Sequence, residues 1–294
     1  MSRTTPISII VPIFNAAATL VESLGALCRE LATVPGSELI CIDNGSIDGS
    51  IEIIRSFPDA QLLQEPKRGA YAARNRGVRA ARGDILAFTD PDCVPTAGWL
   101  QTIATTFEDD ACVVALGMRR PAPDRGLNRL LGDYEVAKDR WVLSSNEPLK
   151  YFGFTNTMAT RRSAWDQHGP FDERLRGSDT IFVRRIVDAA GCAVVRFVPD
   201  MRVAHLEIDG AVTYLKKTFI YGRSLQSYRR AVAVRPLTLP DRLRIFRATM
   251  REHHYGIAQS AALATLLVAG AATWTAGRLA GQRFGWPMPA TGQR

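Results

Sequence analysis

The sequence of 294 residues is poor in cysteine and lacks the spacings of disulfide frameworks and zinc sites. Its five cysteines are scattered, and no two form a C-x-x-C pair: Cys28, Cys41, Cys93, Cys112 and Cys192. This pattern argues for a reducing compartment. The N-terminal stretch MSRTTPISIIVPIFN has one arginine, and Pro12 interrupts its apolar run, so it makes a poor secretory signal. We therefore expect a cytoplasmic protein.

Several motifs of nucleotide-binding and hydrolytic enzymes are also missing. The chain has no G-x-x-x-x-G-K-[ST], and no two glycines lie two positions apart, so G-x-G-x-x-G cannot occur. H-E-x-x-H and G-x-S-x-G are absent as well. These absences argue against a P-loop NTPase, an ordinary NAD-binding Rossmann domain, a zinc hydrolase and a serine hydrolase with a nucleophile elbow.

The net positive charge of the chain comes from one segment. The net charge is +8, and residues 202–251 contain eleven Lys and Arg against three acids, which accounts for the whole excess. The first two hundred residues are nearly balanced, and no aromatic platform accompanies the arginines of the basic segment. Both observations argue against a nucleic-acid partner.

The first part of the chain alternates between strand and helix patterns. Apolar runs predict strands at 7–14, 38–43, 60–65 and 84–90, and helical spacing predicts helices at 19–31, 48–57 and 69–82. Such alternation indicates a mostly parallel sheet with helices on both faces. Ligands of these sheets bind at the carboxyl ends of the strands.

The middle of the chain mixes both patterns. We expect a strand at 112–118, a helix at 127–143 and a helix in the second half of 169–191. Residues 193–207 predict a strand, a turn and a second short strand that ends at His205. Further helices are expected at 211–230 and 239–253.

Polar clusters follow three of the predicted strands. These are Phe14-Asn15, DNGSIDGS (43–50) and TDPD (89–92). By itself DNGSIDGS is also typical of a turn followed by a helix cap, and Asp-Pro-Asp of a solvated turn. Asp90 and Asp92 are two residues apart, so in extended chain they point to the same side. Two carboxylates at a strand end suit Mg²⁺ or Mn²⁺, which fill their other positions with water and substrate phosphates.

Four segments in this order resemble the family 2 glycosyltransferases of the GT-A fold. They are ISIIVPIFNA (7–16), CIDNGSIDGS (41–50), GAYAARNRGVRAARGDILAFTDPDCVP (69–95) and GPFDERLRGSD (169–179). No single motif is specific, but the four together cover roughly residues 6–205 in register. The resemblance implies an α/β fold with a Rossmann-like, mostly parallel sheet and a C-terminal helical extension. It also implies a metal-dependent, inverting transfer from a nucleotide-diphosphate sugar, expected to be a UDP-sugar, to a hydroxyl of a glycan, polysaccharide or lipid-linked acceptor.

The resemblance also assigns roles to residues of the donor site. It places Pro12 and Asn15 beside the nucleotide, and Asp43 at its base, with Asn44 where a second Asp is common. Arg74 and Asn75 flank the donor.

Other positions are implied to act on the metal and the acceptor. Asp90 and Asp92 meet the ribose and the Mg²⁺ or Mn²⁺ ion on the diphosphate. His205 completes the metal site, although a histidine after a strand is also commonly structural. Asp179 is the implied general base.

Two departures concern the acceptor side of this pattern. Ser178 replaces the usual Glu before Asp179, and Ile181 stands where a second Asp is frequent. They leave open a catalytically degenerate scaffold or partner subunit. A sugar nucleotidyltransferase is a second alternative, but PIFNAAAT (12–19) lacks the Gly-rich, basic loop that it would need.

The expected organisation is a catalytic domain over 1–205, a basic helical extension over 206–254, an apolar helix over 255–281 and a tail over 282–294. Residues 257–277 carry no charge and are long enough to span a bilayer, but eight of them are alanine. A helix buried against the domain or a partner chain is the alternative. The preceding arginines favour association with the cytoplasmic face of the membrane through 239–281.

Overall fold

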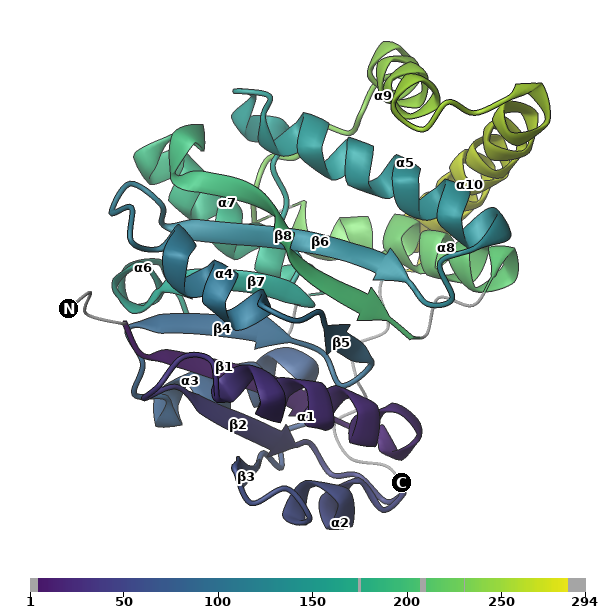
Figure 1. Cartoon of the computed structure of the whole chain (residues 1–294). Helices are drawn as coiled ribbons and strands as arrows, with labels where there is room; N and C mark the ends of the chain where they lie inside the picture. The colour runs from purple at the N-terminus through teal and green to yellow at the C-terminus, as the bar shows by residue number, and fades with distance from the viewer. Residues whose placement is uncertain (1–4, 174–175, 207–209, 230, 285–294) are drawn as a thin grey trace.

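The computed structural model describes residues 5–173, 176–206, 210–229 and 231–284. The strands among these described residues form one sheet (Figure 1). Their order is β3 (Ala60–Gln64), β2 (Glu38–Asp43), β1 (Ile7–Ile13), β4 (Ile85–Thr89), β7 (Thr157–Arg161), β6 (Val114–Pro121), β8 (Val195–His205) and β5 (Cys93–Pro95).

Helices cover both faces of this sheet and extend beyond one of its edges (Figure 1). They are α1 (Ala17–Leu31), α2 (Ser50–Arg55), α3 (Ala70–Ala80), α4 (Trp99–Thr106), α5 (Gly126–Leu143), α6 (Arg162–His168), α7 (Ser178–Ala190), α8 (Ala211–Tyr228), α9 (Leu239–Glu252) and α10 (Ile257–Phe284). Two short 3₁₀ turns lie at Pro148–Lys150 and Cys192–Val194.

The first four strands pair in parallel, as predicted. Side chains alternate between the faces of a strand, so an apolar run in a two-sided sheet feeds two cores. In β1, Ile9 and Val11 pack in the core under α1, α2 and α4, whereas Ile10 packs in the core under α3, α6 and α7. This double burial explains why the run 7–14 shows no polar alternation.

The second half of the sheet is mixed. β7 runs antiparallel to both β4 and β6, while β8 is parallel to β6 and antiparallel to β5. The prediction of a strand, a turn and a second strand over 193–207 is wrong, because β8 is one irregular strand. Its register against β6 jumps between Gly117 and Met118, so the turn-like Pro199-Asp200 lies in a bulge. A side chain at Gly117 would stand 2.0 Å from the Met201 carbonyl oxygen.

The C-terminal helices pack on α5 and on one another. Leu130, Leu131 and Tyr134 of α5 share a core with Ile245 of α9 and Leu263 of α10. Ile245 of α9 is therefore buried inside the protein, whereas Leu239 and Leu243 are 69% and 44% exposed. Arg244, Arg247 and Arg251 are exposed on the outer side of the helix. α9 thus packs on the domain by one side and keeps its arginines exposed on the other.

α8 and α10 approach each other closely along a glycine seam, which we define as Gly222, Gly277 and Gly281. A Cβ atom at Gly222 would lie 2.1 Å from the Trp274 carbonyl oxygen, and one at Gly277 would lie 2.1 Å from that of Phe219. Because only glycine allows backbones to come this near, the seam fixes how α8 lies against α10. The outer face of α10 stays exposed, including Ile257 and Val268. Within the described chain, α10 is the one helix long and apolar enough to cross a membrane.

Candidate active site

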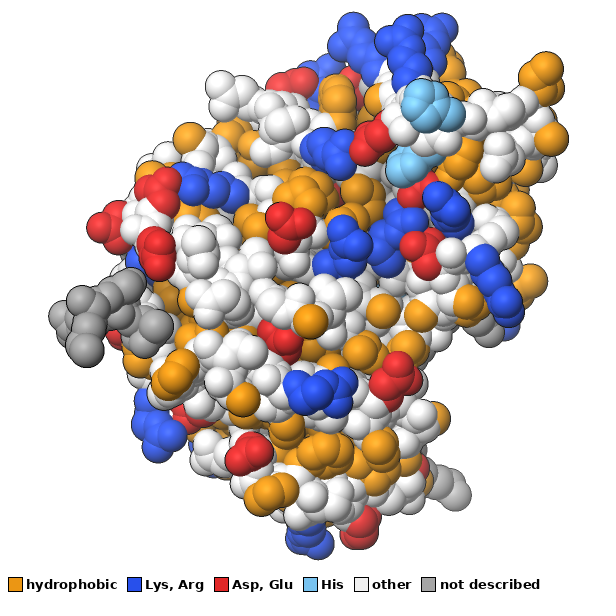
Figure 2. Space-filling view, viewed as in Figure 1, with side chains coloured by type: hydrophobic (Ala, Val, Ile, Leu, Met, Phe, Trp, Pro, Cys, Tyr) orange, Lys and Arg blue, Asp and Glu red, His pale blue; other side chains and the backbone are white. Residues whose placement is uncertain are grey.

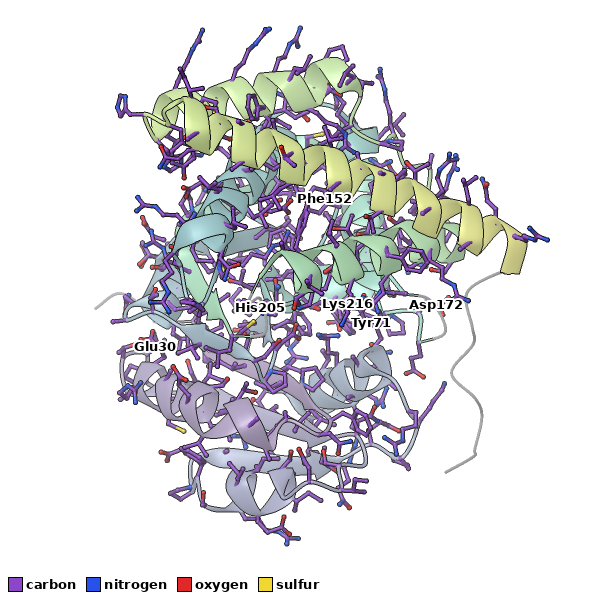
Figure 3. All side chains as sticks on the ribbon, turned by 90° about the vertical axis from the view of Figure 1, so that its right-hand side faces the viewer. Glu30, Tyr71, Phe152, Asp172, His205 and Lys216 are labelled. Atoms are coloured by element: carbon purple, nitrogen blue, oxygen red, sulfur yellow. The ribbon has the colours of Figure 1, made fainter. Side chains whose placement is uncertain are left out.

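The polar clusters after the parallel strands meet at one edge of the sheet, as their positions predicted. Figure 3 looks onto this edge, where His205 ends β8 and Tyr71 stands on α3. α8 crosses the same edge beyond the ends of β6 and β8 (Figures 1 and 3). Pro12 is buried inside β1, opposite Ile42 of β2, so it shapes the strand beneath the edge.

The Asp-Pro-Asp segment is a tightly held turn. The Cys93 amide donates to the Asp90 carbonyl (3.0 Å), and the Leu206 amide donates to the Asp92 carbonyl (2.8 Å). From α1, the Thr19 hydroxyl donates to the Pro91 carbonyl (2.9 Å). These bonds fix the backbone from which the two carboxylates project. The alternative of a merely solvated turn does not describe this arrangement.

The two carboxylates of this turn face different partners. An Asp92 oxygen lies 3.5 Å from Nδ1 of His205, whereas Asp90 forms an ion pair with Arg74 (2.5 Å). Each acid thus has a nitrogen partner from another element, β8 for Asp92 and α3 for Asp90. Their repulsion is relieved in part within the protein itself.

Asp92 and His205 form the centre of a candidate metal site. Ligand atoms of Asp92, Cys93 and His205 lie within 4.8 Å of one another. Burial raises the pKa of the Cys93 thiol, and Asp90 and Asp92 add to the effect. A thiol is also a soft ligand, which Mg²⁺ and Mn²⁺ disfavour, so a carboxylate oxygen and an imidazole nitrogen remain. This pair fits Mn²⁺ or Mg²⁺ with remaining positions for water and phosphate oxygens. Asp90 is not part of this cluster.

Asp43 and Asn44 hold the loop after β2. The Asp43 carboxylate accepts bonds from the amides of Gly45 (3.0 Å) and Ser46 (3.1 Å). Asn44 is 5% exposed, and its amide group donates to the carbonyls of Glu65 and Lys67, both at 2.8 Å. A carboxylate cannot donate, so an Asp at this position would face two carbonyl oxygens. This accounts for the Asn where a second Asp is common.

The next part of the same loop bonds to the start of α1. The turn-and-cap alternative concerned the helix that follows the loop, α2, whose N-cap Gly49 makes no side-chain capping bond. The Asp48 carboxylate accepts a bond from the amide of Ala17, the first residue of α1, at 2.9 Å. Asn15 joins the loop from the other side, because its side-chain oxygen accepts from the Ile47 amide at 2.9 Å. Phe14 is 50% exposed next to it, with the Arg68 guanidinium over its ring at 4.4 Å. An exposed ring above this loop is available to a planar ligand.

Asn75 is buried and ties α3 to the segment before α7. Its amide exchanges hydrogen bonds with the backbone of Phe171 and donates to Glu173 at 2.9 Å. The same helix turn carries Arg74, which is 5% exposed. Among the described residues, Nε of Arg74 has no hydrogen-bond partner. Arg74 can therefore donate to a ligand, whereas Asn75 positions the loop that leads to Asp179.

Asp179 lies in the first turn of α7, within electrostatic reach of the donor-side groups. Its carboxylate accepts the Thr180 amide at 2.8 Å. Burial raises its pKa, while the Thr180 bond, Arg74 and a hydrogen bond from Tyr71 act in the opposite direction. A carboxylate with a raised pKa is a better proton acceptor than an ordinary Asp. The structure thus brings Asp179, Arg74 and Asp90 together.

The two departures from the family pattern have structural explanations. The Ser178 hydroxyl accepts a bond from the Asp172 amide (2.5 Å) and closes the loop before α7. Ile181 is 1% exposed and packs in the interior, where a carboxylate would be costly to bury. Neither change touches the carboxylate of Asp179.

Sequence reasoning missed several side chains of this site. Phe14, Thr19 and Tyr71 are in or beside the quoted motifs but show their contacts only in three dimensions. Asn156 precedes β7 beside Asp90, and its side-chain oxygen is buried with no hydrogen-bond partner among the described residues. For Asn156 no spacing signal exists, because β7 was not predicted.

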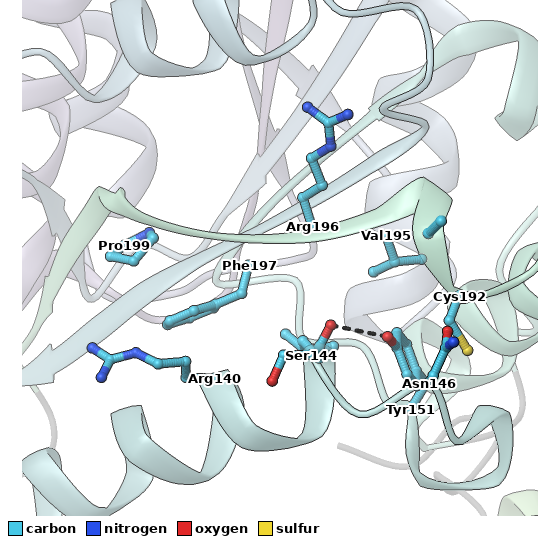
Figure 4. Close-up of a pocket in the computed structure, with 11 residues that line it drawn as sticks. Arg140, Ser144, Asn146, Tyr151, Cys192, Val195, Arg196, Phe197 and Pro199 are labelled. Carbon is cyan, nitrogen blue, oxygen red and sulfur yellow. Dashed lines mark hydrogen bonds between the residues drawn. The ribbon is translucent and has the colours of Figure 1, made fainter.

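A separate hollow lies at the opposite end of β8. It has a volume of about 490 Å³ and is lined by Arg140, Tyr151, Cys192, Arg196 and Phe197, among others (Figure 4). Val195 begins β8 in this hollow, whereas His205 ends β8 at the candidate site. The hollow is therefore separate from the candidate site.

Comparisons with known proteins bear on the family and the fold. The sequence model described as Glycosyl transferase family 2 matches residues 8–171. Glycosyltransferase AglE of Haloferax volcanii is 30% identical over 203 residues, which are 64% of each chain. Pre-mycofactocin glycosyltransferase of Mycobacterium tuberculosis is 27% identical over 74% of this chain and 46% of its own length. The chain thus spans about half to two-thirds of these relatives.

Solved structures show the same fold. The mannosyltransferase PcManGT from Pyrobaculum calidifontis, in complex with GDP-Man and Mn²⁺, superposes with a TM-score of 0.59 at 19% identity over 96% of this chain and 81% of its own. Glucosyl-3-phosphoglycerate synthase from M. tuberculosis, in complex with Mn²⁺ and UDP-glucose, gives 0.53 at 19% identity over 79% and 80%. The predicted GT-A fold class, with its C-terminal helical extension, is confirmed.

Proposed function

The chain belongs to glycosyl transferase family 2, and on this premise we propose that it transfers a sugar from a nucleotide-diphosphate sugar to an acceptor hydroxyl. The observation that carries the proposal is the convergence of three elements: the Asp92–His205 pair, the Arg74–Asp90 ion pair and Asp179. Together they provide the groups for metal and diphosphate binding and a proton acceptor within one site.

On the donor side, Asp92 and His205 would hold a divalent cation, Mg²⁺ or Mn²⁺, on the diphosphate. When bound, this ion supplies stabilisation for the charge that develops on the leaving group. Arg74 orients Asp90, which we assign to the ribose, since Asp90 lies outside the cluster formed by Asp92 and His205. We assign Asp43 and Phe14 to the base of the nucleotide, and UDP is the nucleotide we propose. Asn15, Asn44 and Asn75 act by holding the loops, and Pro12 by shaping β1 beneath them.

On the acceptor side, Asp179 takes the proton of the attacking hydroxyl. A nucleoside diphosphate is a good leaving group once its charge is neutralised, so no second carboxyl group is needed to protonate it. One base opposite one leaving group means a single displacement, which inverts the anomeric centre. The raised pKa of Asp179 suits proton transfer better than that of an ordinary carboxylate.

The test is nucleotide release from UDP-, GDP- and CDP-sugars by the full chain, with Mn²⁺, with Mg²⁺ and with EDTA. We expect one nucleotide sugar to be consumed with a divalent ion present and none with EDTA. Consumption that is unchanged in EDTA would contradict the metal-dependent mechanism. No consumption of any donor by folded protein would favour the scaffold alternative.

We further propose that α9 and α10 place the enzyme at the cytoplasmic face of a membrane. Figure 2 shows Lys and Arg side chains gathered at the end of the molecule that carries α9, where Arg244, Arg247 and Arg251 are exposed. The uncharged outer face of α10 lies close by. Because α10 packs along α8, which carries Lys216 and Lys217, an interfacial position is favoured over a membrane-spanning one.

Vesicles of phosphatidylcholine with and without phosphatidylglycerol test this placement. Each arginine near an anionic surface contributes about 1 kcal/mol, so changing Arg244, Arg247 and Arg251 to Gln should weaken binding about 100-fold. The matched control changes the exposed Arg29, Arg55 and Arg82, which lie far from α9 in sequence. Equal losses in the two triple variants, or equal binding to neutral vesicles, would contradict the proposal.

A further inference from the structure

The direction of acceptor entry follows from the reaction proposed above, on which this inference rests. An inverting displacement needs the attacking hydroxyl on the side of the sugar opposite the diphosphate. Tyr71 and Arg74 approach Asp179 from α3, on the donor side. Arg119 of β6 and Tyr228 of α8 also interact electrostatically with Asp179. In the sheet, β6 is separated from β4 by β7, so these groups come from the far side.

On that far side lies a group of charged side chains that the donor chemistry does not use. We call it the acceptor-side cluster and define it as Arg119, Glu135, Lys138 and Asp139. Nη2 of Arg119 lies 3.3 Å from an Asp139 oxygen and 3.9 Å from a Glu135 oxygen. Lys138 pairs with Glu135 and stands 3.6 Å from the other Asp139 oxygen. The cluster has two cations and two carboxylates.

Aromatic rings join this cluster to the base. The Arg119 guanidinium lies over the Phe154 ring at 4.2 Å, and Lys138 lies over the Phe152 ring at 5.6 Å. Gly153, between the two rings, packs against Asp179, since a Cβ atom there would be 2.5 Å from the Asp179 carbonyl oxygen. Figure 3 shows Phe152 on the same side of the molecule as Tyr71 and His205. The segment that carries both rings therefore packs against the backbone of Asp179 through Gly153.

The cluster remains reachable for a ligand. The side chains of Arg119, Glu135 and Lys138 are 21%, 30% and 20% exposed. Tyr221 of α8, which interacts with Arg119, is 54% exposed. Asp139 is 2% exposed, and its Oδ1 is buried without a hydrogen-bond partner among the residues described. This oxygen faces the Lys138 ammonium at 3.6 Å, so its charge is compensated within the cluster.

The chemistry of the cluster selects the kind of acceptor. Carboxylates and a guanidinium bind the hydroxyl groups of a sugar by hydrogen bonds. Aromatic rings beside them pack against the apolar faces of the sugar ring. The balanced charge gives no net attraction for a small anion, and Asp179 adds a further negative charge. We propose that the acceptor-side cluster, with Phe152 and Tyr221, is the acceptor subsite and that it takes a neutral saccharide whose hydroxyl reaches Asp179.

The experiment measures nucleotide release by the full chain with its donor and Mn²⁺, with acceptors added one at a time. The neutral probes are p-nitrophenyl glycosides of glucose, mannose, galactose and N-acetylglucosamine. The anionic probes are 3-phosphoglycerate and p-nitrophenyl glucuronide. We expect at least one neutral glycoside to accelerate release and the anions to have no effect. Acceleration by an anion alone, or by no glycoside while the donor is still consumed, would overturn the inference.

Two variants test whether the acceptor binds at the acceptor-side cluster. Tyr221→Ala and Glu135→Gln should each raise the acceptor KM about fivefold to tenfold, while the donor KM keeps its wild-type value. Val212→Ala, at a 67% exposed position of the same helix, is the matched control. Equal changes in the acceptor and donor KM values would show a structural effect and contradict the subsite. If the wild-type protein consumed no donor at all, this result would count against the proposed function instead.

Discussion

The loops on the donor side of Asp179 are held mainly by hydrogen bonds to backbone groups, whereas the proposed acceptor side consists of side chains from separate elements. Asn44 and Asn75 each bind backbone carbonyls of another loop. Arg119, Glu135 and Tyr221 come instead from β6, α5 and α8. A backbone-anchored loop depends on a few residue types at fixed spacing. A site assembled from side chains of distant elements has no such fixed spacing in the sequence.

Asp179 lies where the two sides meet, and its loss should have the largest effect. Asp179→Asn keeps the size of the side chain but removes the proton acceptor, so we expect the transfer rate to fall about 1,000-fold. Donor affinity should stay near wild type, because the donor groups are separate side chains. Rates are measured by product formation and affinity by calorimetry.

The matched control for this change is Asp166→Asn, at an exposed position of α6. It should leave both quantities unchanged. A variant at Asp179 that transferred sugar at more than a tenth of the wild-type rate would exclude it as the base.

The donor-side fold and motifs could be predicted from the sequence because they are local. The parallel strands follow from apolar runs, and the meeting of Asn15, Asp43 and Asp90 follows from where those strands end. β7 and the bulge in β8 could not be predicted, since their pairing depends on contacts across long sequence separations. The ion pair of Arg74 with Asp90 and the hydrogen bond of Tyr71 to Asp179 could not be predicted for the same reason.

A second substitution tests the rigidity of the donor side. Asn44→Asp should remove two donated hydrogen bonds and place a carboxylate beside the carbonyls of Glu65 and Lys67. For a group this buried, we expect a loss of about 3 kcal/mol in the free energy of unfolding. Urea denaturation measures it. Asn146→Asp, at an exposed position, is the control, and an equal loss there would show that Asn44 has no special role.

A third substitution disturbs the acceptor side alone. Gly277→Ala adds a methyl group 2.1 Å from the Phe219 carbonyl oxygen and should push α10 from α8. We expect a loss of about 2 kcal/mol in stability, as in overpacked interiors, and a raised acceptor KM with an unchanged donor KM. Gly25→Ala in α1 is the control, because its Cβ would meet only a side-chain nitrogen of Arg29 at 3.6 Å. A raised donor KM in Gly277→Ala would contradict the separation of the two sides.

The smallest effect concerns pH. Burial raises the pKa of Asp179 above the ordinary 3.8, so activity should be lost as the pH falls through this raised value. The hydrogen bond from Tyr71 favours the charged form. Tyr71→Phe should therefore move the acid limb of the kcat/KM profile to higher pH, by about one unit or less. A shift to lower pH would mean that Tyr71 does not stabilise the carboxylate.

The most direct test of the account is calorimetry of UDP binding, with and without Mn²⁺, to the wild type and to Asp92→Asn. Asp84→Asn is the control, since Asp84 precedes β4, is exposed and lies at the opposite end of that strand from Asp90. We predict that Mn²⁺ strengthens UDP binding to the wild type and to Asp84→Asn, and that this gain disappears in Asp92→Asn. An equal Mn²⁺ effect in all three proteins would contradict the assignment of Asp92 to the metal site.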